Sequence, residues 1–337
     1  MNKNLSVSIL IVNWNGEDVL TECLNSLLSL RYKPLEIIVV DNASSDSSLE
    51  LLKNAFGEKV KVISLKENVG FASGINLGFG LAKGDIVATL NNDMVVEPTW
   101  LDQPISILKS NQDVGLISCK QINYFDRTLI DGLYHVITKD LLFTHFGGGK
   151  MLSEIHDHDK QGYVISANGG SAIIRKELFI ELGGYDPNFF GYLEETDFCM
   201  RAFVRGWKCV YSPDAVVYHK DGHSFKKKGA RRFYYIERNR IWFLYKNYPM
   251  GLILKRLFYI GIMELKVIKT FFFSLSKPSL YFKTRIDALK RLKEYKTVRN
   301  KNVLLFKNRR DKFFEFEKMK IISFTNAEPS EKEHLSN

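Results

Sequence analysis

Short apolar runs alternate with amphipathic stretches over the first third of the chain. The runs are rich in β-branched residues, which is typical of buried strands, and they cover residues 7–12, 35–40, 60–65 and 85–90. Between them, apolar residues recur at helical spacing over residues 17–30, 48–56 and 70–82. Strands that alternate with helices predict an α/β fold with a mainly parallel sheet and right-handed crossovers.

The middle of the chain continues this pattern less regularly. Apolar spacing predicts helices over residues 100–110, 176–182 and 195–205 and strands over 114–118 and 163–174, the latter interrupted by Gly169-Gly170. Gly206 is well placed to end the 195–205 helix. Residues 144–162 include three consecutive glycines and mixed charges, and we expect a mobile loop or lid there.

From about residue 231 the chain becomes rich in aromatic and basic residues and helical in pattern. Residues 250–273 read as one apolar helix that ends before Pro278. At 100° per residue, Lys255, Lys266 and Lys269 fall within roughly 60° of one another and form a basic stripe. Such a helix can lie in a membrane interface with its lysines reaching the headgroups, or it can be a core helix with solvated lysines.

The charge divides the chain in the same place. Residues 1–223 hold 20 Lys+Arg and 28 Asp+Glu, whereas residues 224–320 hold 27 Lys+Arg and 7 Asp+Glu. This asymmetry predicts an acidic globular part (1–225), a basic helical part (226–325) that faces an anionic partner, and a disordered tail (326–337). The partner could be a membrane surface or a nucleic acid.

Sequence signals for location are few. We expect no signal peptide and no membrane span, because no run of about 18 uncharged apolar residues exists. The four cysteines lack CxxC spacing and read as reduced thiols of a cytosolic protein.

Carboxylates follow two of the predicted strands. Asp93 ends the strand 85–90, and a carboxylate there is costly unless it meets a cation or dense hydrogen bonding. Ligands bind at the open end of α/β sheets, so Asp93 is a candidate for holding a metal ion, with an ordinary turn as the alternative. Asp41 ends the second strand and could accept a hydrogen bond from a ribose or a base, or shape the turn before residue 48.

Two further groups carry candidate chemistry. The first group is an acidic cluster of Glu194, Glu195 and Asp197. It includes a candidate general base with a raised pKa. Alternatively, the carboxylates stabilise the helix start through its dipole, by about 0.3–1 kcal/mol each. His219 ends the run 213–219 and is either a core histidine or a ligand that joins Asp93 in a mixed oxygen and nitrogen site for Mg²⁺ or Mn²⁺. His156 and His158 lie in a polar loop and are expected to be solvated.

Several function classes lack their motifs. The turn Asn13-Trp14-Asn15-Gly16 replaces the G-x-G-x-x-G of dinucleotide-binding folds, and no Walker A motif exists. A nucleotidyltransferase would need a Gly-rich loop with Lys or Arg after the first strand, which is absent. A nucleic-acid binder would use the basic part with exposed aromatic side chains as stacking platforms. Both remain alternatives.

The ordered motifs resemble those of the family 2 (GT-A fold) nucleotide-sugar glycosyltransferases, especially rhamnosyltransferase-like members, over about residues 5–225. They are Val12-Asn13-Trp14-Asn15, Val40 to Asp46, Asn68-Val69-Gly70-Phe71-Ala72 with Asn76, Leu90-Asn91-Asn92-Asp93, Gly183-Gly184-Tyr185-Asp186, Glu194 to Asp197 with Arg201 and Gly206, and Pro213 to His219.

The resemblance implies roles for these residues. Asn13, Asn15 and Asp41 would hold the nucleoside, with Asp41 on the base. Asp93 would be the surviving carboxylate of an Asp-x-Asp metal motif whose first position is Asn91 here. Glu194 or Glu195 would be the base, in a cluster with Asp197, and His219 would contact the metal or the diphosphate. The cleft for the nucleotide sugar would be lined by Asn68, Gly70, Asn76, Asn91 and Asn92.

The resemblance also implies the reaction and its setting. We expect an inverting transfer of a sugar such as rhamnose from a nucleotide-diphosphate donor, assisted by Mg²⁺ or Mn²⁺. The acceptor would be a growing glycan or a lipid-linked sugar in cell-surface polysaccharide synthesis. The protein would be cytoplasmic and peripheral on the inner face of the membrane, docked through residues 226–320, and we expect no nucleic-acid partner.

Overall fold

The computed structural model describes residues 4–156, 158–220, 229–319 and 322–323. Its first half alternates as predicted: β1 (Val7–Asn13), α1 (Glu17–Leu28), β2 (Glu36–Asp41), α2 (Ser48–Phe56), β3 (Lys61–Ser64), α3 (Phe71–Leu81) and β4 (Ile86–Thr89). These strands pair in parallel in the order β3-β2-β1-β4. β1 is buried along its whole length, as its continuous apolar run predicts.

The second half makes the sheet mixed. It contains β5 (Met94–Val96), α4 (Asp102–Ser110), β6 (Val114–Asn123), β7 (Ile130–Gly132), β10 (Gly162–Val164), β11 (Ala172–Arg175), α5 (Lys176–Glu181), α6 (Glu194–Val204) and β12 (Lys208–His219). The sheet continues from β4 in the order β11-β6-β12-β10-β13, where β13 is Ile322–Ser323. β11 runs antiparallel to both neighbours, whereas β6 and β12 are parallel. The α/β class is confirmed, with a mixed sheet.

Part of the predicted loop over 144–162 is regular structure. β8 (His135–Ile137) and β9 (Phe143–His145) form a separate hairpin, and Leu152–Glu154 form a 3₁₀ turn, η1. The N–H of Ile130 also donates to the carbonyl of Lys150 (2.8 Å), which ties the segment to β7. The mobility of the segment stays a prediction.

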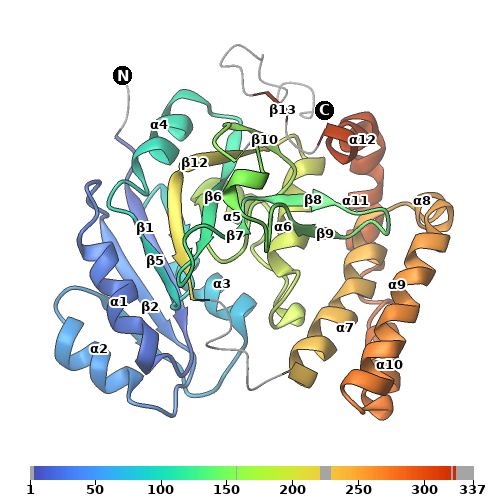
Figure 1. Ribbon diagram of the computed structural model, residues 1–337, viewed down its shortest axis with the longest axis horizontal. Helices are drawn as coiled ribbons and strands as arrows, with labels where there is room; N and C mark the ends of the chain where they lie inside the picture. Colours follow the sequence, from blue (N-terminus) through green and yellow to red (C-terminus); the bar gives the residue numbers. More distant parts are fainter. Residues whose placement is uncertain (1–3, 157, 221–228, 320–321, 324–337) are drawn as a thin grey trace.

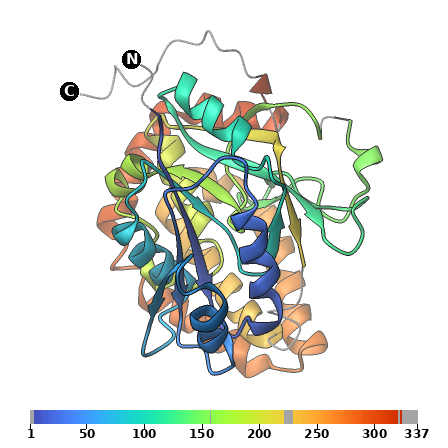
Figure 2. The same cartoon turned by 90° about the vertical axis from the view of Figure 1, so that its left-hand side faces the viewer.

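The basic C-terminal part forms helices, as predicted. They are α7 (Gly229–Asn247), α8 (Met250–Lys255), α9 (Leu257–Lys269), the π-helical turn η3 (Thr270–Ser274), α10 (Pro278–Lys290), α11 (Lys296–Asn308) and α12 (Arg310–Met319). Figures 1 and 2 show that α1 and α2 lie at one end of the molecule and α7 to α12 at the other. Among the described helices, none combines the length and the apolar character needed to cross a bilayer.

The prediction of a single helix over residues 250–273 is wrong. The chain bends at Arg256, between α8 and α9, where the guanidinium donates two hydrogen bonds of 2.7 Å to the carboxylate of Glu317 in α12. Lys255 therefore belongs to α8 and Lys266 and Lys269 to α9, so the three lysines do not share one helical stripe. A tertiary contact, invisible to local periodicity, accompanies this break.

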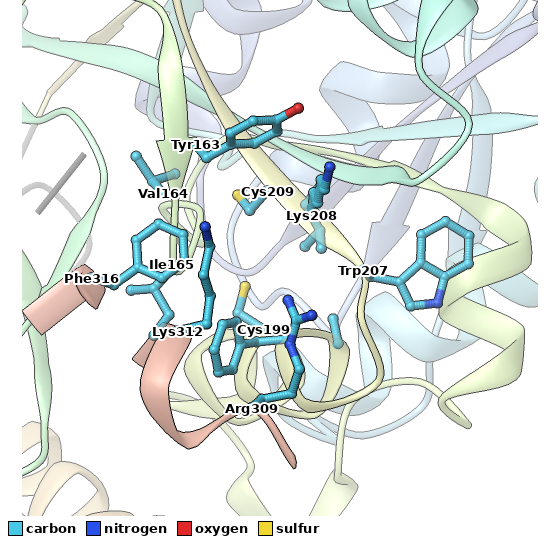
Figure 3. Close-up of a pocket in the computed structure, with 13 residues that line it drawn as sticks. Tyr163, Val164, Ile165, Cys199, Trp207, Lys208, Cys209, Arg309, Lys312 and Phe316 are labelled. Carbon is cyan, nitrogen blue, oxygen red and sulfur yellow. The ribbon is translucent and has the colours of Figure 1, made fainter. Parts of the chain in front are cut away.

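The C-terminal helices pack directly on the α/β part. Figure 3 shows Arg309, Lys312 and Phe316 facing Cys199 of α6 and Cys209 of β12 across a cavity of about 20 Å³. That volume is enough for about one water molecule. Both thiols are free and buried, which agrees with the expectation of reduced cysteines. The cavity is a packing interface and too small for a ligand. The division of the chain at residue 225 stays a prediction, as does the tail 326–337, which lies outside the described residues.

Candidate functional site

Polar side chains gather at the carboxyl edge of the parallel strands. Asn13 and Asp41 are register partners at the ends of β1 and β2. The amide of Asn13 donates to Asp41 Oδ2 (2.9 Å), and Asn92 Nδ2 donates to Asn13 Oδ1 (2.7 Å). All three side chains are buried. The structure thus brings together three residues that the sequence placed in separate motifs.

This cluster lies at the point where the strand order reverses. The sheet grows from β1 to β3 in one direction, and β4 then pairs on the other side of β1. Ligands bind outside the carboxyl ends of strands at such a point. A Cβ on Gly16 would lie 2.2 Å from Asn92 Nδ2, so the glycine permits the approach of that amide. Asn15 has a positive φ of 52° and accepts a hydrogen bond from the N–H of Ser45 (2.7 Å).

A second loop joins this edge to α3. Asn42 Nδ2 donates to Asn68 Oδ1 (3.1 Å), which also accepts from the N–H of Gly70 (2.9 Å). Gly70 has a φ of +86°, and a Cβ there would lie 2.5 Å from the carbonyl oxygen of Phe190. The position therefore requires glycine, and it brings the loop against the segment that precedes α6.

The side chain of Asn76 is engaged elsewhere and is not free to line the nucleotide-sugar cleft, which is the role expected for it. Its Nδ2 donates to the carbonyl of Tyr185 (2.8 Å), and its Oδ1 accepts from the N–H of the same residue (2.8 Å). Its amide is thus used to bind α3 to the chain before α6. A direct contact with a nucleotide sugar does not fit this geometry.

Asp93 and His219 meet because β5 pairs with β12. The register partner of His219 is Met94, which places Asp93 beside it, and His219 Nε2 lies 3.5 Å from Asp93 Oδ1. His219 Nδ1 lies 2.8 Å from Asp131 Oδ2 of β7. Burial lowers the pKa of His219, but the hydrogen bond with Asp131 and the charges of Asp93 and Asp131 outweigh it and raise that pKa to about 10.

Asp131 is the residue that sequence reasoning missed. It is one polar residue in a three-residue strand, Ile130-Asp131-Gly132, and follows no strand end. Burial raises its pKa, but the hydrogen bond and charge of His219 outweigh this and lower it. Only the pairing of β7 with β6, which is itself paired with β12, brings Asp131 to His219.

Asp93 and His219, which we call the Asp93 corner, offer part of the ligand set of a divalent cation. Asp93 Oδ1 is buried and has no hydrogen-bond partner among the described residues, which leaves a hard oxygen donor available. His219 adds a nitrogen donor once it is deprotonated. The described residues contain no group of three or more His, Cys, Asp or Glu side chains placed to hold a metal. A cation here would therefore need ligands from a bound diphosphate and water.

The turn before α6 is strained. Phe190, Tyr192 and Leu193 have positive φ values of 67°, 70° and 67°, and such strain persists only where surrounding contacts impose it. The buried Asn239 of α7 supplies those contacts. Its Nδ2 lies 3.0, 2.9 and 2.8 Å from the carbonyl oxygens of Phe189, Gly191 and Tyr192.

This turn presents Glu194 and Glu195 at the start of α6. Glu194 is only 4% exposed, and its Oε2 has no hydrogen-bond partner within the described chain. Burial and the neighbouring charge of Glu195 raise the pKa of Glu194 well above its usual range. Glu195 is half-buried and accepts a hydrogen bond from the Thr196 hydroxyl (3.0 Å).

Gly169 and Gly170 connect the two carboxylate corners. A Cβ on Gly169 would lie 2.6 Å from Glu195 Cγ. The carbonyl of Gly170 accepts from the N–H of Asn91 (2.8 Å), two residues before Asp93. The Gly-Gly break that the sequence showed inside a strand is therefore a close passage between Glu195 and the Asp93 corner.

Asp197 has a different environment from its two neighbours. Its carboxylate is fully buried and accepts from Arg201 Nε (2.9 Å), Lys246 Nζ (3.0 Å) and Asn247 Nδ2 (3.0 Å). Burial raises its pKa, but these cations and hydrogen bonds outweigh it and lower it. A catalytic role does not fit this geometry, because both oxygens are engaged in anchoring α7 to α6.

Comparisons with known proteins agree with this arrangement. The family model described as glycosyl transferase family 2 matches residues 8–183, just over half of the chain. An uncharacterized glycosyltransferase of Haemophilus influenzae is 30% identical over 110 residues, which are 32% of this chain and 34% of that protein. The chain thus spans about a third of the length of this relative.

Solved structures show the same fold over nearly the whole chain. S. aureus TarS 1-349 in complex with UDP is 17% identical, covers 93% of this chain and 89% of its own, and has a TM-score of 0.56. A mannosyltransferase from Pyrobaculum calidifontis in complex with GDP-Man and Mn²⁺ is 15% identical, with 94% and 88% covered and a TM-score of 0.55. These likenesses show the fold, and the match of the family model over more than half of the chain shows that the chain belongs to glycosyl transferase family 2.

Proposed function

We propose that this protein transfers a sugar from a nucleotide-diphosphate donor to an acceptor hydroxyl with inversion at the anomeric carbon. The observation that carries the proposal is the passage of Gly169-Gly170 between Glu195 and the Asp93 corner. It puts a candidate base and a candidate site for a charged diphosphate on two sides of one short segment. An in-line displacement needs a base on one side of the sugar and stabilisation of the leaving group on the other.

The donor would occupy the carboxyl edge of the sheet. Asn13 and Asp41 would hold the nucleoside, and the Asn68–Gly70 loop would border the cleft. The S. aureus neighbour contains UDP and the Pyrobaculum calidifontis neighbour contains GDP-Man, which supports a nucleotide-sugar donor. Rhamnose is the sugar that the motif resemblance suggests.

Asp93 and His219 would hold Mg²⁺ or Mn²⁺ together with the diphosphate. When bound, the ion supplies positive charge that stabilises the leaving diphosphate. Mn²⁺ in the Pyrobaculum calidifontis neighbour supports this assignment. Asn91 offers a neutral amide where the family motif has a carboxylate, so the protein itself contributes less negative charge and the diphosphate contributes more.

We assign the base to Glu195. A base must reach the acceptor, and Glu195 is half-buried, whereas Glu194 is 4% exposed and has a pKa that burial and the charge of Glu195 raise. As the acceptor oxygen forms its bond to the anomeric carbon, its proton passes to Glu195. The bond between that carbon and the diphosphate oxygen breaks, and the nucleotide diphosphate leaves with the electron pair.

The test is a donor screen followed by two isosteric variants. Wild-type protein is incubated with candidate nucleotide sugars and Mn²⁺, and nucleotide release is measured. Glu195→Gln should reduce turnover by about 10²-fold or more while nucleotide binding survives, and Glu194→Gln should keep most activity. A fully active Glu195→Gln enzyme would exclude Glu195 as the base, and no nucleotide release from any donor would count against the transferase itself.

We further propose that α9 and α10 dock on an anionic membrane, where a lipid-linked acceptor for cell-surface polysaccharide synthesis would be presented on the inner face. Glu264 of α9 accepts hydrogen bonds from Tyr281 (2.7 Å) and Arg285 (2.8 Å) of α10, which holds the helices side by side. Their outer sides expose apolar side chains at i, i+4 and i+7: Phe258, Ile262, Leu265, and Phe282, Ile286, Leu289. Exposed lysines such as Lys266 and Lys269 flank them.

This pattern suits an interfacial helix pair better than a solvated surface. Large contiguous apolar faces mark interaction sites, and each lysine near an anionic surface contributes about 1 kcal/mol. A nucleic-acid partner would not use aliphatic side chains of this kind, because bases stack on aromatic faces and phosphates need cations.

A further inference from the structure

A groove of about 430 Å³ opens between α7, α10 and the strained turn before α6. This volume lies within the range of small-molecule sites. Phe190 of the turn, Tyr235 and Trp242 of α7, and Lys290 at the end of α10 are among its lining residues. The nucleoside cluster at the strand ends contributes none of the lining side chains, so the groove is separate from the proposed donor site.

Aromatic rings and one guanidinium form a rigid wall of the groove. Phe190 and Tyr235 stack with centroids 4.9 Å apart and an interplanar angle of 8°. Arg238 lies 4.2 Å from the ring centroid of Trp242 and 5.0 Å from that of Tyr235. Arg238 also donates to the carbonyls of Asn188 (2.8 Å) and Phe189 (2.9 Å), which fixes its position. The stack of Phe190 on Tyr235 covers one face of each of these two rings, so a sugar ring in the groove would contact the remaining parts of both that line it.

The rim of the groove is cationic. Lys290 is exposed and forms no hydrogen bond or ion pair with the described residues, and Arg291 follows it. The one carboxylate of the lining, Asp287, already accepts hydrogen bonds from Tyr234 (2.7 Å) and Lys283 (2.6 Å). Arg291 donates to Asn188 Oδ1 and lies 3.8 Å from the carboxylate of Glu294, so Lys290 supplies the rim charge that favours a phosphate or another anion.

The groove adjoins both the proposed base and the proposed membrane face. Phe190 lies four residues before Glu194, and its carbonyl accepts from the N–H of Ala72 in α3 (3.2 Å). On α10, Lys290 directly follows Leu289, one of the exposed apolar residues of the outer face. The groove thus shares Phe190 with the turn that precedes the proposed base, and Lys290 lies next to the apolar face of α10 in the chain.

We propose that this groove binds the phosphate-bearing end of a lipid-linked sugar acceptor, an inference that rests on the proposed transferase function. The phosphate or diphosphate would meet Lys290 and Arg291, the first sugar would pack on Phe190 and Tyr235, and the lipid would follow Phe282, Ile286 and Leu289. The acceptor class is therefore a glycosyl phosphate on a lipid carrier.

The first experiment measures binding of soluble probes to the full chain without donor. Saturation-transfer NMR compares glucose 1-phosphate with methyl glucoside and with inorganic phosphate. We expect glucose 1-phosphate to bind more tightly than either. Lys290→Glu should weaken its binding by about tenfold, the equivalent of about 1.4 kcal/mol. The matched control is Lys301→Glu, the same charge change at an exposed position of α11 outside the groove, and it should leave binding unchanged.

Two outcomes would overturn the groove assignment. One is equal affinity for glucose 1-phosphate and methyl glucoside, and the other is an equal effect of the Lys290 and Lys301 variants. A farnesyl-linked glucose phosphate separates the two sources of the anion. It should bind more tightly than glucose 1-phosphate and lose this advantage in Phe282→Asp. Equal affinity for both probes would mean that free sugar phosphate, and not a lipid carrier, fits the groove.

Donor turnover distinguishes this inference from the proposed function. Nucleotide release to water needs no acceptor, so it should be the same in wild type and in the Lys301→Glu control, whose substitution lies outside the groove. If wild type releases no nucleotide from any donor but still binds glucose 1-phosphate through Lys290, the transferase proposal fails and the groove stands.

Discussion

Glu194 and Asp197 lie within one turn of α6, yet the pKa values of their carboxyls are shifted in opposite directions. Burial raises the pKa of each carboxyl. Asp197 meets Lys246 and Arg201, whose charges more than compensate, whereas Glu194 meets the negative charge of Glu195. One helix start therefore carries one carboxyl whose pKa is lowered and one whose pKa is raised, and the cations that make the difference come from this helix and from α7.

The raised pKa of Glu194 predicts a pH-dependent cost. Below about pH 4.5 Glu194 is protonated in the folded and the unfolded chain, so it has little effect on the free energy of unfolding. As pH rises above that value the unfolded chain ionises first, and the folded state loses stability relative to it. Glu194→Gln removes this loss. Thermal unfolding should therefore show the variant gaining on wild type between pH 5 and pH 8, and a constant difference across that range would contradict the assignment.

A metal at the Asp93 corner predicts an asymmetry between two neighbouring positions. Asp93→Ala should abolish the stabilisation of the protein by Mn²⁺ plus a nucleotide diphosphate, measured as a shift in Tm, and should lose transfer activity. Asn91→Asp should keep both, because it restores a carboxylate found in the family motif. An Asp93→Ala protein that retains the Tm shift and the activity would show that the cation, if needed, binds elsewhere.

At the scale of elements, α7 links the helical region to the proposed chemistry. Asn239 binds three carbonyls of the turn before Glu194, and Lys246 and Asn247 bind Asp197 at the start of α6. The turn has three residues in the left-handed region, which costs free energy that these contacts offset. The basic region is therefore part of the scaffold that positions Glu195.

Removing the Asn239 amide should lower kcat by more than the loss of stability alone would explain. Asn239→Ala removes the Asn239 donor from the carbonyls of Gly191 and Tyr192, whereas the carbonyl of Phe189 keeps Arg238, and the variant should destabilise the protein by about 1–3 kcal/mol. We expect kcat to fall more than KM changes, because the variant relaxes the turn that holds Glu195. Asn302→Ala is the matched control, since Asn302 is also buried and its Nδ2 donates to Asn247 (3.1 Å). If Asn239→Ala and Asn302→Ala lose the same amount of stability and the same amount of kcat, the role of Asn239 is structural only.

At the scale of the whole molecule, the two ends of the protein differ in chemistry. The α/β end is acidic, and the helical end is basic with exposed aromatic and aliphatic side chains. Deleting the helical region would be a poor test of membrane docking, because it would also remove Lys246 from buried Asp197. Surface substitutions keep that contact and separate docking from folding.

Replacing exposed phenylalanines of the helical end should reduce membrane binding. Phe258 and Phe273 are 73% and 74% exposed, and each is worth about 1.5–3 kcal/mol if it enters the bilayer. Phe258→Ser with Phe273→Ser should lower flotation with anionic vesicles by more than tenfold. Phe125→Ser, at a 71% exposed position of the α/β end, should have no effect. Equal flotation of wild type, the double variant and Phe125→Ser would contradict docking through this face. Flotation with neutral vesicles at high salt would contradict an electrostatic contribution to docking.

The order of strands and helices in the first half of the chain was determined by the sequence itself. Burial on both faces of a parallel strand requires a continuous apolar run, and the polar residues that end such runs, Asn13, Asp41 and Asp93, necessarily come to one edge of the sheet. The family motifs lie on this framework. Local periodicity and strand-end chemistry were therefore enough to predict the α/β class and to select Asp41 and Asp93 as candidates, whereas the family resemblance supplied the residues expected to line the donor cleft.

Long-range pairing decided the rest. Strand pairing brings Asp131 to His219, and Asn76 donates a hydrogen bond to the carbonyl of Tyr185. Lys246 of α7 forms an ion pair with Asp197, which gives that carboxylate a structural role. The break at Arg256 likewise coincides with a contact to Glu317 in another helix. Side-chain charge state and availability depend on neighbours that are distant in the chain, and only the tertiary structure brings those neighbours together.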